Sequence, residues 1–275
     1  MSQYSEILSF FAYPFALSVL LVAIHAYLGL HVIQREVIFV DISLAQVAAL
    51  GGAASLLWAK EGDESTSLPS SLAFCLLAAL LLATFRRYEK RISQETLIGI
   101  TYAFASGVLV LVMDRLPHGT EHLKEALVGN ILFVGKEQVI QTGLVYGIVG
   151  IIHWIFREAF WRCSRHERQS FFWDFLFYLL FGVVITFSTH HAGVLVVFSL
   201  LVAPAALACR FADRVRDRLL LAWLIGLVCT TSAFILSYVF DWPAGAGLVA
   251  VLTGAFFLTL FASLLYEKVI ACRSS

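Results

Sequence analysis

The sequence repeatedly contains apolar runs of the length that crosses a lipid bilayer. The hydrocarbon core of a bilayer requires a helix of about 20 mostly apolar residues, and such runs recur along the whole chain. The mean hydropathy is +0.86 and only 14% of the residues are charged, whereas soluble domains carry about 25%. Because water cannot solvate such a surface, we expect an all-α integral membrane protein.

Nine runs are candidates for membrane-spanning helices, and the run at 71–85 is the shortest. We expect a single transmembrane domain over residues 1–275, a bundle of eight to nine spans that includes broken helices. The first run is interpreted as a mature helix, because the N-terminus has no basic segment and no small-residue cleavage site. The candidates are 10–30, 37–59, 71–85, 95–113, 138–156, 170–188, 191–209, 219–240 and 245–266.

The basic residues are divided unequally between the two sets of alternating connections. Fifteen fall in one set and four in the other, and the richer set normally faces the cytoplasm. This asymmetry predicts an outside N-terminus and a cytoplasmic C-terminus. The first set is Arg35, Arg86, Arg87, Lys90, Arg91, Arg157, Arg162, Arg165, Arg168, Arg210, Arg214, Arg216, Arg218, Lys268 and Arg273, and the second is Lys60, Arg115, Lys124 and Lys136.

Residues 191–218 combine a long apolar run with a charged end. The proline predicts a broken helix, and the small residues after it lead into a segment whose charges alternate in sign. Such a cytoplasmic segment is typical of a docking surface for a partner, which we expect at about 205–218. Its candidate residues are Pro204, Ala205, Arg210, Asp213, Arg214 and Arg216.

Four of the eight histidines lie in or beside the predicted outer connections. His118 and His122 are four residues apart, so on a helix they point the same way and can share a divalent metal. A short interfacial helix is expected at about 120–133, and the alternative is that these histidines are solvated loop residues. His190 and His191 are adjacent and point about 100° apart on a helix. One of them can face a pathway, or both can be interfacial.

Polar residues also occur near the start of the second apolar run. Asp41 is a candidate for a transport pathway and a metal ligand, because a carboxylate inside a membrane helix is costly and is usually functional. It is alternatively a cap or an ion-pair partner near the inner surface. Ser43 and Gln46 are further pathway candidates, although Gln46 alternatively makes only a hydrogen bond between helices.

Several functions are disfavoured by missing motifs. The chain contains no G-x-x-x-x-G-K-[ST] sequence, so it does not bind ATP as a P-loop protein does. It also contains no G-x-S-x-G or H-E-x-x-H sequence. The formal net charge is +0 and gives no indication of nucleic-acid binding. We therefore expect a protein that is not an enzyme and has no cofactor of its own.

Three stretches together resemble a known family. They are GLHVIQREVIFVDISLAQVAALGG at 29–52, ETLIGITYAFASGVLVLV with LVGNIL at 95–112 and 127–132, and HAGVLVVFSLLVAPAALA at 191–208. In order and spacing they are similar to the membrane permease subunit of ABC-type importers of zinc, manganese and iron.

The resemblance implies how such a chain works. It implies a permease in the plasma (inner) membrane of a prokaryote that imports a divalent transition metal by alternating access. The expected metal is zinc or manganese, and iron is the further option. It also implies that the segment at about 205–218 is a coupling helix, on which a separate ABC ATPase subunit that binds ATP docks. A soluble metal-binding protein delivers the metal from outside, and a second permease copy, identical or related, completes the core.

The sequence departs from the family pattern at two places. Gln46 stands where the family often has a histidine, and His190 and His191 stand where a lysine is common. The metal ligands have therefore moved, or the metal differs. The alternatives from other classes are a stand-alone secondary metal transporter and, less favoured, an intramembrane metalloenzyme.

Overall fold

The computed structural model describes residues 3–57, 66–86, 92–116, 119, 126–129, 131–167 and 170–273, with side chains between residues 11 and 266. These residues form helices and no strands, which confirms the expected all-α class. The helices are α1 (Gln3–Gln34), α2 (Val40–Leu56), α3 (Ser67–Arg86), α4 (Gln94–Met113), the 3-10 helix η1 (Ile131–Phe133), α6 (Lys136–Ile155), α7 (Arg157–Ser164), α8 (Phe171–Ala192), α9 (Val194–Phe211), α10 (Val215–Phe240) and α11 (Ala244–Arg273).

Within the described residues, eight helices are long and apolar enough to cross a membrane: α1, α3, α4, α6, α8, α9, α10 and α11. The predicted eight to nine spans are therefore confirmed. The ninth, α2, has only 17 residues. Residues 71–85, the shortest run in the sequence, lie inside a 20-residue helix. The less apolar segment SLPS at 67–70 and Arg86 extend α3 beyond the predicted run.

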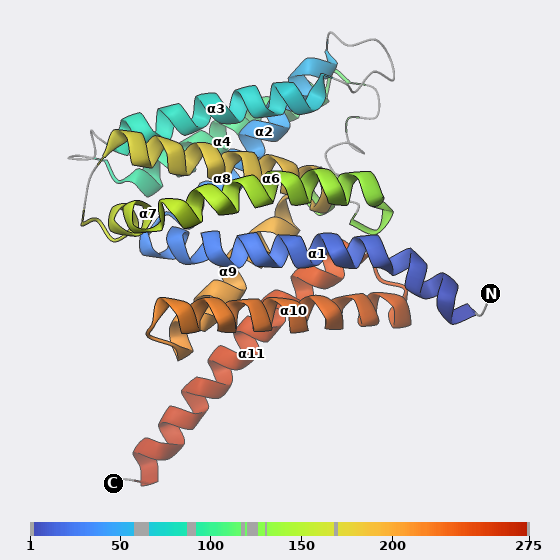
Figure 1. Ribbon diagram of the computed structural model, residues 1–275, viewed down its shortest axis with the longest axis vertical. Helices are drawn as coiled ribbons and strands as arrows, with labels where there is room; N and C mark the ends of the chain where they lie inside the picture. Colours follow the sequence, from blue (N-terminus) through green and yellow to red (C-terminus); the bar gives the residue numbers. More distant parts are fainter. Residues whose placement is uncertain are drawn as a thin grey trace.

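The long helices run side by side between two ends of the bundle (Figure 1). The N-terminus lies at one end, which we call the N-terminal end. At the other end lie α7 and the α9–α10 connection (residues 212–214), and we call this the basic end. The C-terminal part of α11 leaves the bundle, so the C-terminus lies apart from the other helices (Figure 1).

Helix α9 packs closely against α1. A Cβ atom added at Gly29 would lie 2.1 Å from the carbonyl oxygen of Leu201 and 3.0 Å from the Cβ atom of Ala205. Only glycine allows two helices to approach so closely. This contact places α9 in the middle of the bundle, where it also packs against α10 and α11.

The predicted break at Pro204 was wrong, because α9 is helical from Val194 to Phe211. Membrane helices tolerate a proline where neighbouring helices pack around it, and the α1 contact involves residues on both sides of Pro204. Pro204 and Ala205 are both buried in the bundle. These two residues therefore do not belong to an exposed docking surface.

No separate coupling helix forms within residues 205–218. The segment consists of the last turns of α9, the non-helical residues 212–214 and the first turn of α10. The Arg218 side chain closes the connection, because its Nε atom donates a hydrogen bond of 2.8 Å to the carbonyl oxygen of Ala212. The result is a tight charged turn between two spans.

The interfacial helix expected at about 120–133 is not continuous in its described part. Residues 126–128 are helical, Gly129 then adopts φ +68°, and η1 follows. Gly129 lies against Gly193, which separates α8 from α9 with φ +80°. A Cβ atom on Gly193 would lie 2.3 Å from the Gly129 nitrogen. The backbone of the α4–α6 connection at Gly129 therefore packs directly against the break between α8 and α9.

Candidate functional site

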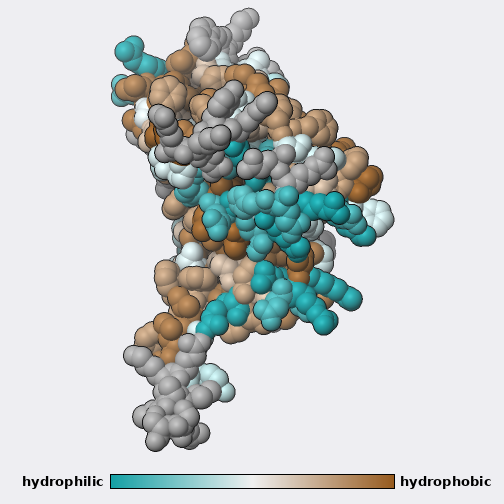
Figure 2. Space-filling model, turned by 90° about the vertical axis from the view of Figure 1, so that its left-hand side faces the viewer, coloured by the Kyte–Doolittle hydropathy of each residue, from teal (hydrophilic) through white to brown (hydrophobic). Residues whose placement is uncertain are grey.

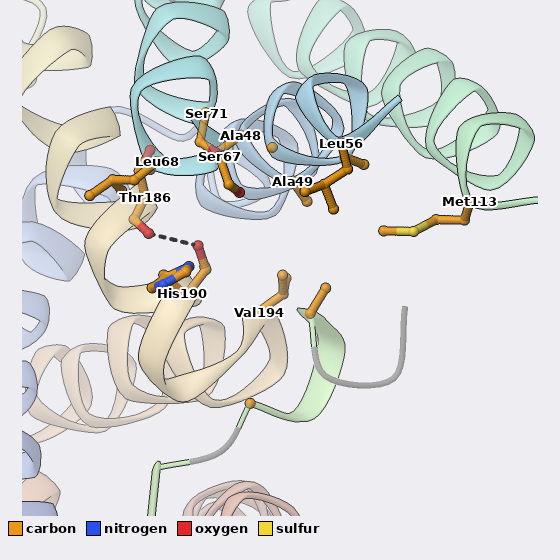
Figure 3. A pocket seen from close by; sticks show the side chains of 15 residues that line it. Ala48, Ala49, Leu56, Ser67, Leu68, Ser71, Met113, Thr186, His190 and Val194 are labelled. Atoms are coloured by element: carbon orange, nitrogen blue, oxygen red, sulfur yellow. Dashed lines mark hydrogen bonds between the residues drawn. The ribbon is translucent and has the colours of Figure 1, made fainter. Parts of the chain in front are cut away.

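A cavity of about 260 Å³ lies at the N-terminal end, between the ends of α2, α3, α8 and α9. This volume is below the range of about 300–1,000 Å³ typical of sites for organic ligands, and it suits a small hydrated ion. Small, hydroxyl-bearing and imidazole side chains line much of the open space in Figure 3, together with the apolar side chains of Leu56, Leu68, Met113 and Val194. The small and polar part of the lining includes Ala48, Ala49, Gly52, Ser67, Ser71, Thr186, Thr189 and His190.

The two adjacent histidines differ in their relation to this cavity. His190 is exposed and forms part of the cavity wall (Figure 3). His191 is half-buried, does not line the cavity, and its ring centroid lies 5.2 Å from that of His190. Consecutive residues on a helix point about 100° apart, so only one of these two side chains on α8 faces the cavity.

One stripe of α2 runs from the cavity toward the basic end. Gly52 and Ala48 line the cavity, and Ala45 and Asp41 continue the same stripe at intervals of three and four residues. Asp41 lies in the first turn of α2 and is only 1% exposed. Seven residues of helix separate it from Ala48, a rise of about 10 Å.

Asp41 is near a second carboxylate that the sequence analysis missed. Glu95 in the first turn of α4 accepts a hydrogen bond of 3.3 Å from the backbone N–H of Phe39, the N-cap residue of α2. Asp41 follows Phe39 by two residues, so this hydrogen bond places Glu95 beside the first turn of α2, where α4 packs against it. The only signal in the sequence was an acidic residue at the start of an apolar run, which is also common at ordinary helix starts.

Both carboxylates retain an oxygen atom without a hydrogen-bond partner in the part of the chain that the structure describes. These atoms are Asp41 Oδ1 and Glu95 Oε2, and both are buried. Buried carboxylate oxygens are normally paired with a donor or bound to a cation. Two such carboxylates near each other therefore form a candidate cation site.

The other polar residues of α2 lie on different sides of the helix. Ser43 is fully buried and its Oγ atom has no partner among the described residues. It lies about 200° around α2 from Asp41, so the two do not share a face. Gln46 is buried at 6% exposure and does not line the cavity. The structure thus brings Asp41 toward Glu95 and not toward Ser43 or Gln46.

The remaining metal candidates are not tested by the geometry. His118 and His122 lie outside the described residues. Among the residues that are described, no group of three or more His, Cys, Asp or Glu side chains could hold a metal ion. The Asp41–Glu95 pair would need further ligands from water, the backbone or another chain.

Hydrophilic side chains gather on the face at the basic end (Figure 2). Arg210, Asp213, Arg214 and Arg216 are exposed there, so these four members of the predicted docking segment are accessible to a partner.

The chain matches the model of the ABC 3 transport family over residues 8–263. The chain belongs to this family. It is a multi-pass membrane protein and the permease subunit of an ABC transporter. This assignment decides against the stand-alone secondary transporter that the sequence left as an alternative.

Individual relatives are similar to the permease over most of its length. The "Probable metal transport system membrane protein" of Chlamydia muridarum is 25% identical over 238 residues, which cover 82% of this chain and 79% of the relative. The "Manganese transport system membrane protein" of Listeria innocua is 29% identical over 205 residues, covering 70% and 72%.

A solved structure shares the permease fold. "PsaBC from Streptococcus pneumoniae in complex with Fab" contains a chain that aligns with a TM-score of 0.73 at 20% identity, covering 90% of each chain. The similarity supports the arrangement of helices described above.

Proposed function

We propose that the permease imports a divalent transition metal, with manganese as the favoured cargo, by alternating access. The observation that carries the proposal is the pair of carboxylates Asp41 and Glu95, each with one buried oxygen that has no hydrogen-bond partner among the described residues. They lie beyond the cavity along α2, so an ion that enters at the N-terminal end meets them on its way to the basic end. His190 at the cavity wall makes the first contact, with His191 beside it.

The donor chemistry favours manganese over zinc. Carboxylate, hydroxyl and water oxygens suit manganese, whereas imidazole and thiolate ligands favour zinc. Gln46, which stands where the family often has a histidine, removes an imidazole from this region. The manganese system of Listeria innocua supports the same cargo. Zinc and iron(II) are the competing cargoes, and His118 and His122 remain candidate ligands at the outer surface.

The direction of transport rests on the charge asymmetry. We place the N-terminal end outside and the basic end in the cytoplasm of a prokaryotic plasma membrane, because the Lys- and Arg-rich connections lie at the basic end. A separate ABC ATPase subunit then docks on the exposed residues of the α9–α10 turn. A soluble metal-binding protein delivers the cargo, and a second permease copy completes the pathway.

Co-purification and metal competition test this function. A tagged permease extracted gently from its native membrane is expected to bring down an ABC ATPase that mass spectrometry identifies. In cells expressing the transporter, unlabelled manganese is expected to suppress uptake of radioactive manganese more strongly than equal zinc. Recovery of the permease without an ATPase contradicts the partner assignment, and stronger suppression by zinc contradicts the cargo.

A further inference from the structure

A surface hollow of about 510 Å³ lies at the basic end, where α6 ends and α7 begins. One non-helical residue, Phe156, separates the two helices. The wall of the hollow combines Trp154 and Phe156 with Arg157, Glu158 and Arg162. Its volume is within the range of about 300–1,000 Å³ that holds small organic ligands.

Aromatic side chains surround the hollow at the membrane boundary. Trp154 is 71% exposed and Phe156 is 43% exposed. Phe171 and Phe172, at the start of the neighbouring α8, are also exposed. Because α6 and α8 are both spans that end here, these rings lie where membrane proteins place an aromatic belt at the headgroup level.

The charges of the hollow favour an anion. Glu158 is 4.0 Å from Arg162 in an exposed pair, an arrangement that holds its partners only weakly. Arg157 is exposed and has no acidic partner within 4.0 Å among the described residues. Arg165 lies further along, 3.8 Å from Glu167. Three arginines against two glutamates leave this short segment with a net positive charge.

We propose that the α6–α7 hollow binds an anionic phospholipid of the adjacent leaflet. The headgroup phosphate lies between Arg157 and Arg162, and the acyl chains extend along the exposed apolar side of α6 next to Trp154. Basic pockets beside membrane helices bind anionic headgroups in this way. The inference does not rest on the identity of the cargo.

Native mass spectrometry of the permease in lipid nanodiscs tests the site. The discs contain phosphatidylglycerol and phosphatidylcholine with identical acyl chains. Three forms of the permease are compared: the unchanged protein, the double variant R157A/R162A and the control variant R115A. Arg115 is an exposed arginine at the N-terminal end and is the matched control. Each arginine near an anionic headgroup contributes roughly a fivefold factor in affinity, so the double variant is expected to retain phosphatidylglycerol about 25-fold less tightly.

The outcomes separate the possible occupants of the hollow. Preferential retention of phosphatidylglycerol by the unchanged and R115A proteins, lost in the double variant and insensitive to added inorganic phosphate, supports the site. Equal retention of both lipids shows an apolar contact only, and displacement by inorganic phosphate shows a soluble anion site. Unchanged retention in R157A/R162A shows that these arginines do not hold the lipid. Each of these three results overturns the proposal.

Discussion

Arg35, the residue after α1, and Asp174 of α8 form a buried ion pair, with 2.9 Å between Arg35 Nη1 and Asp174 Oδ1. Arg86 of α3 pairs with the same carboxylate oxygen. Arg35 Nε also donates to Ser164 Oγ at 3.0 Å, and its guanidinium carbon lies 3.9 Å from the centre of the Phe177 ring. One carboxylate therefore joins three helices at the basic end, and Ser164 ties α7 to them.

Replacing Asp174 by Asn is expected to destabilise the permease strongly. Two buried guanidinium groups would lose the one carboxylate that pairs with them among the described residues, and breaking a buried pair in this way costs about 3–5 kcal/mol. Thermal unfolding in detergent measures the effect, with the exposed Asp217 changed to Asn as the control. If D174N and D217N unfold at the same temperature, the cluster does not hold these helices together.

Removing either carboxylate of the candidate cation site is expected to reduce transport without loss of the fold. D41N and E95Q keep the side-chain size but remove the charge that attracts a cation. A loss of roughly 2 kcal/mol in ion binding corresponds to about a thirtyfold lower affinity. Manganese uptake at sub-saturating concentration measures it, and E137Q, at an exposed position of α6, is the control. Uptake that is normal in both D41N and E95Q would remove this pair from the pathway.

Replacing Gly193 by Ala is expected to destabilise the contact between the Gly129 backbone and the α8–α9 break. A non-glycine residue at φ +80° costs about 1–3 kcal/mol, and the added Cβ atom would also strike the Gly129 backbone. The unfolding temperature of G193A should therefore fall well below that of G147A, since no atom lies within 4 Å of a Cβ atom at Gly147. Equal unfolding temperatures for G193A and G147A would show that the Gly129–Gly193 contact does not stabilise the permease.

Charge reversal at Arg214 and Arg216 is expected to release the ATPase. Both side chains are exposed in the α9–α10 turn, whereas Arg218 is excluded from the test because it closes that turn. R214E/R216E should fold normally but recover less than about a tenth of the ATPase in a pull-down, a difference of about 1.4 kcal/mol or more. The exposed Lys136 at the opposite end, changed to Glu, should have no effect. Normal ATPase recovery from R214E/R216E places the docking surface elsewhere.

The spans were predictable because length and hydropathy decide what crosses a bilayer. The sequence did not reveal α7, whose eight residues are too polar for a span and too few for a clear helical period. It also counted Arg35 and Arg86 among the connections, although both side chains are buried. Their partner, Asp174, lies more than 80 residues further along the chain, and only the packing of α1, α3 and α8 brings the three together.

The candidate site was predictable in part for the same reason. Asp41 was evident as a carboxylate in an apolar run, and His190 as a histidine at the end of one. The proximity of Glu95 depends on how α4 packs against the start of α2. The cavity depends on the ends of four helices, and its small side chains carry no individual signature of function.

Uptake of radioactive manganese into proteoliposomes that contain the permease, its ATPase and its binding protein tests the central claim most directly. We predict uptake that requires both ATP and the ATPase, and that falls when Asp41 is changed to Asn. Manganese uptake by the permease alone, driven by a pH gradient and indifferent to ATP, would contradict the account.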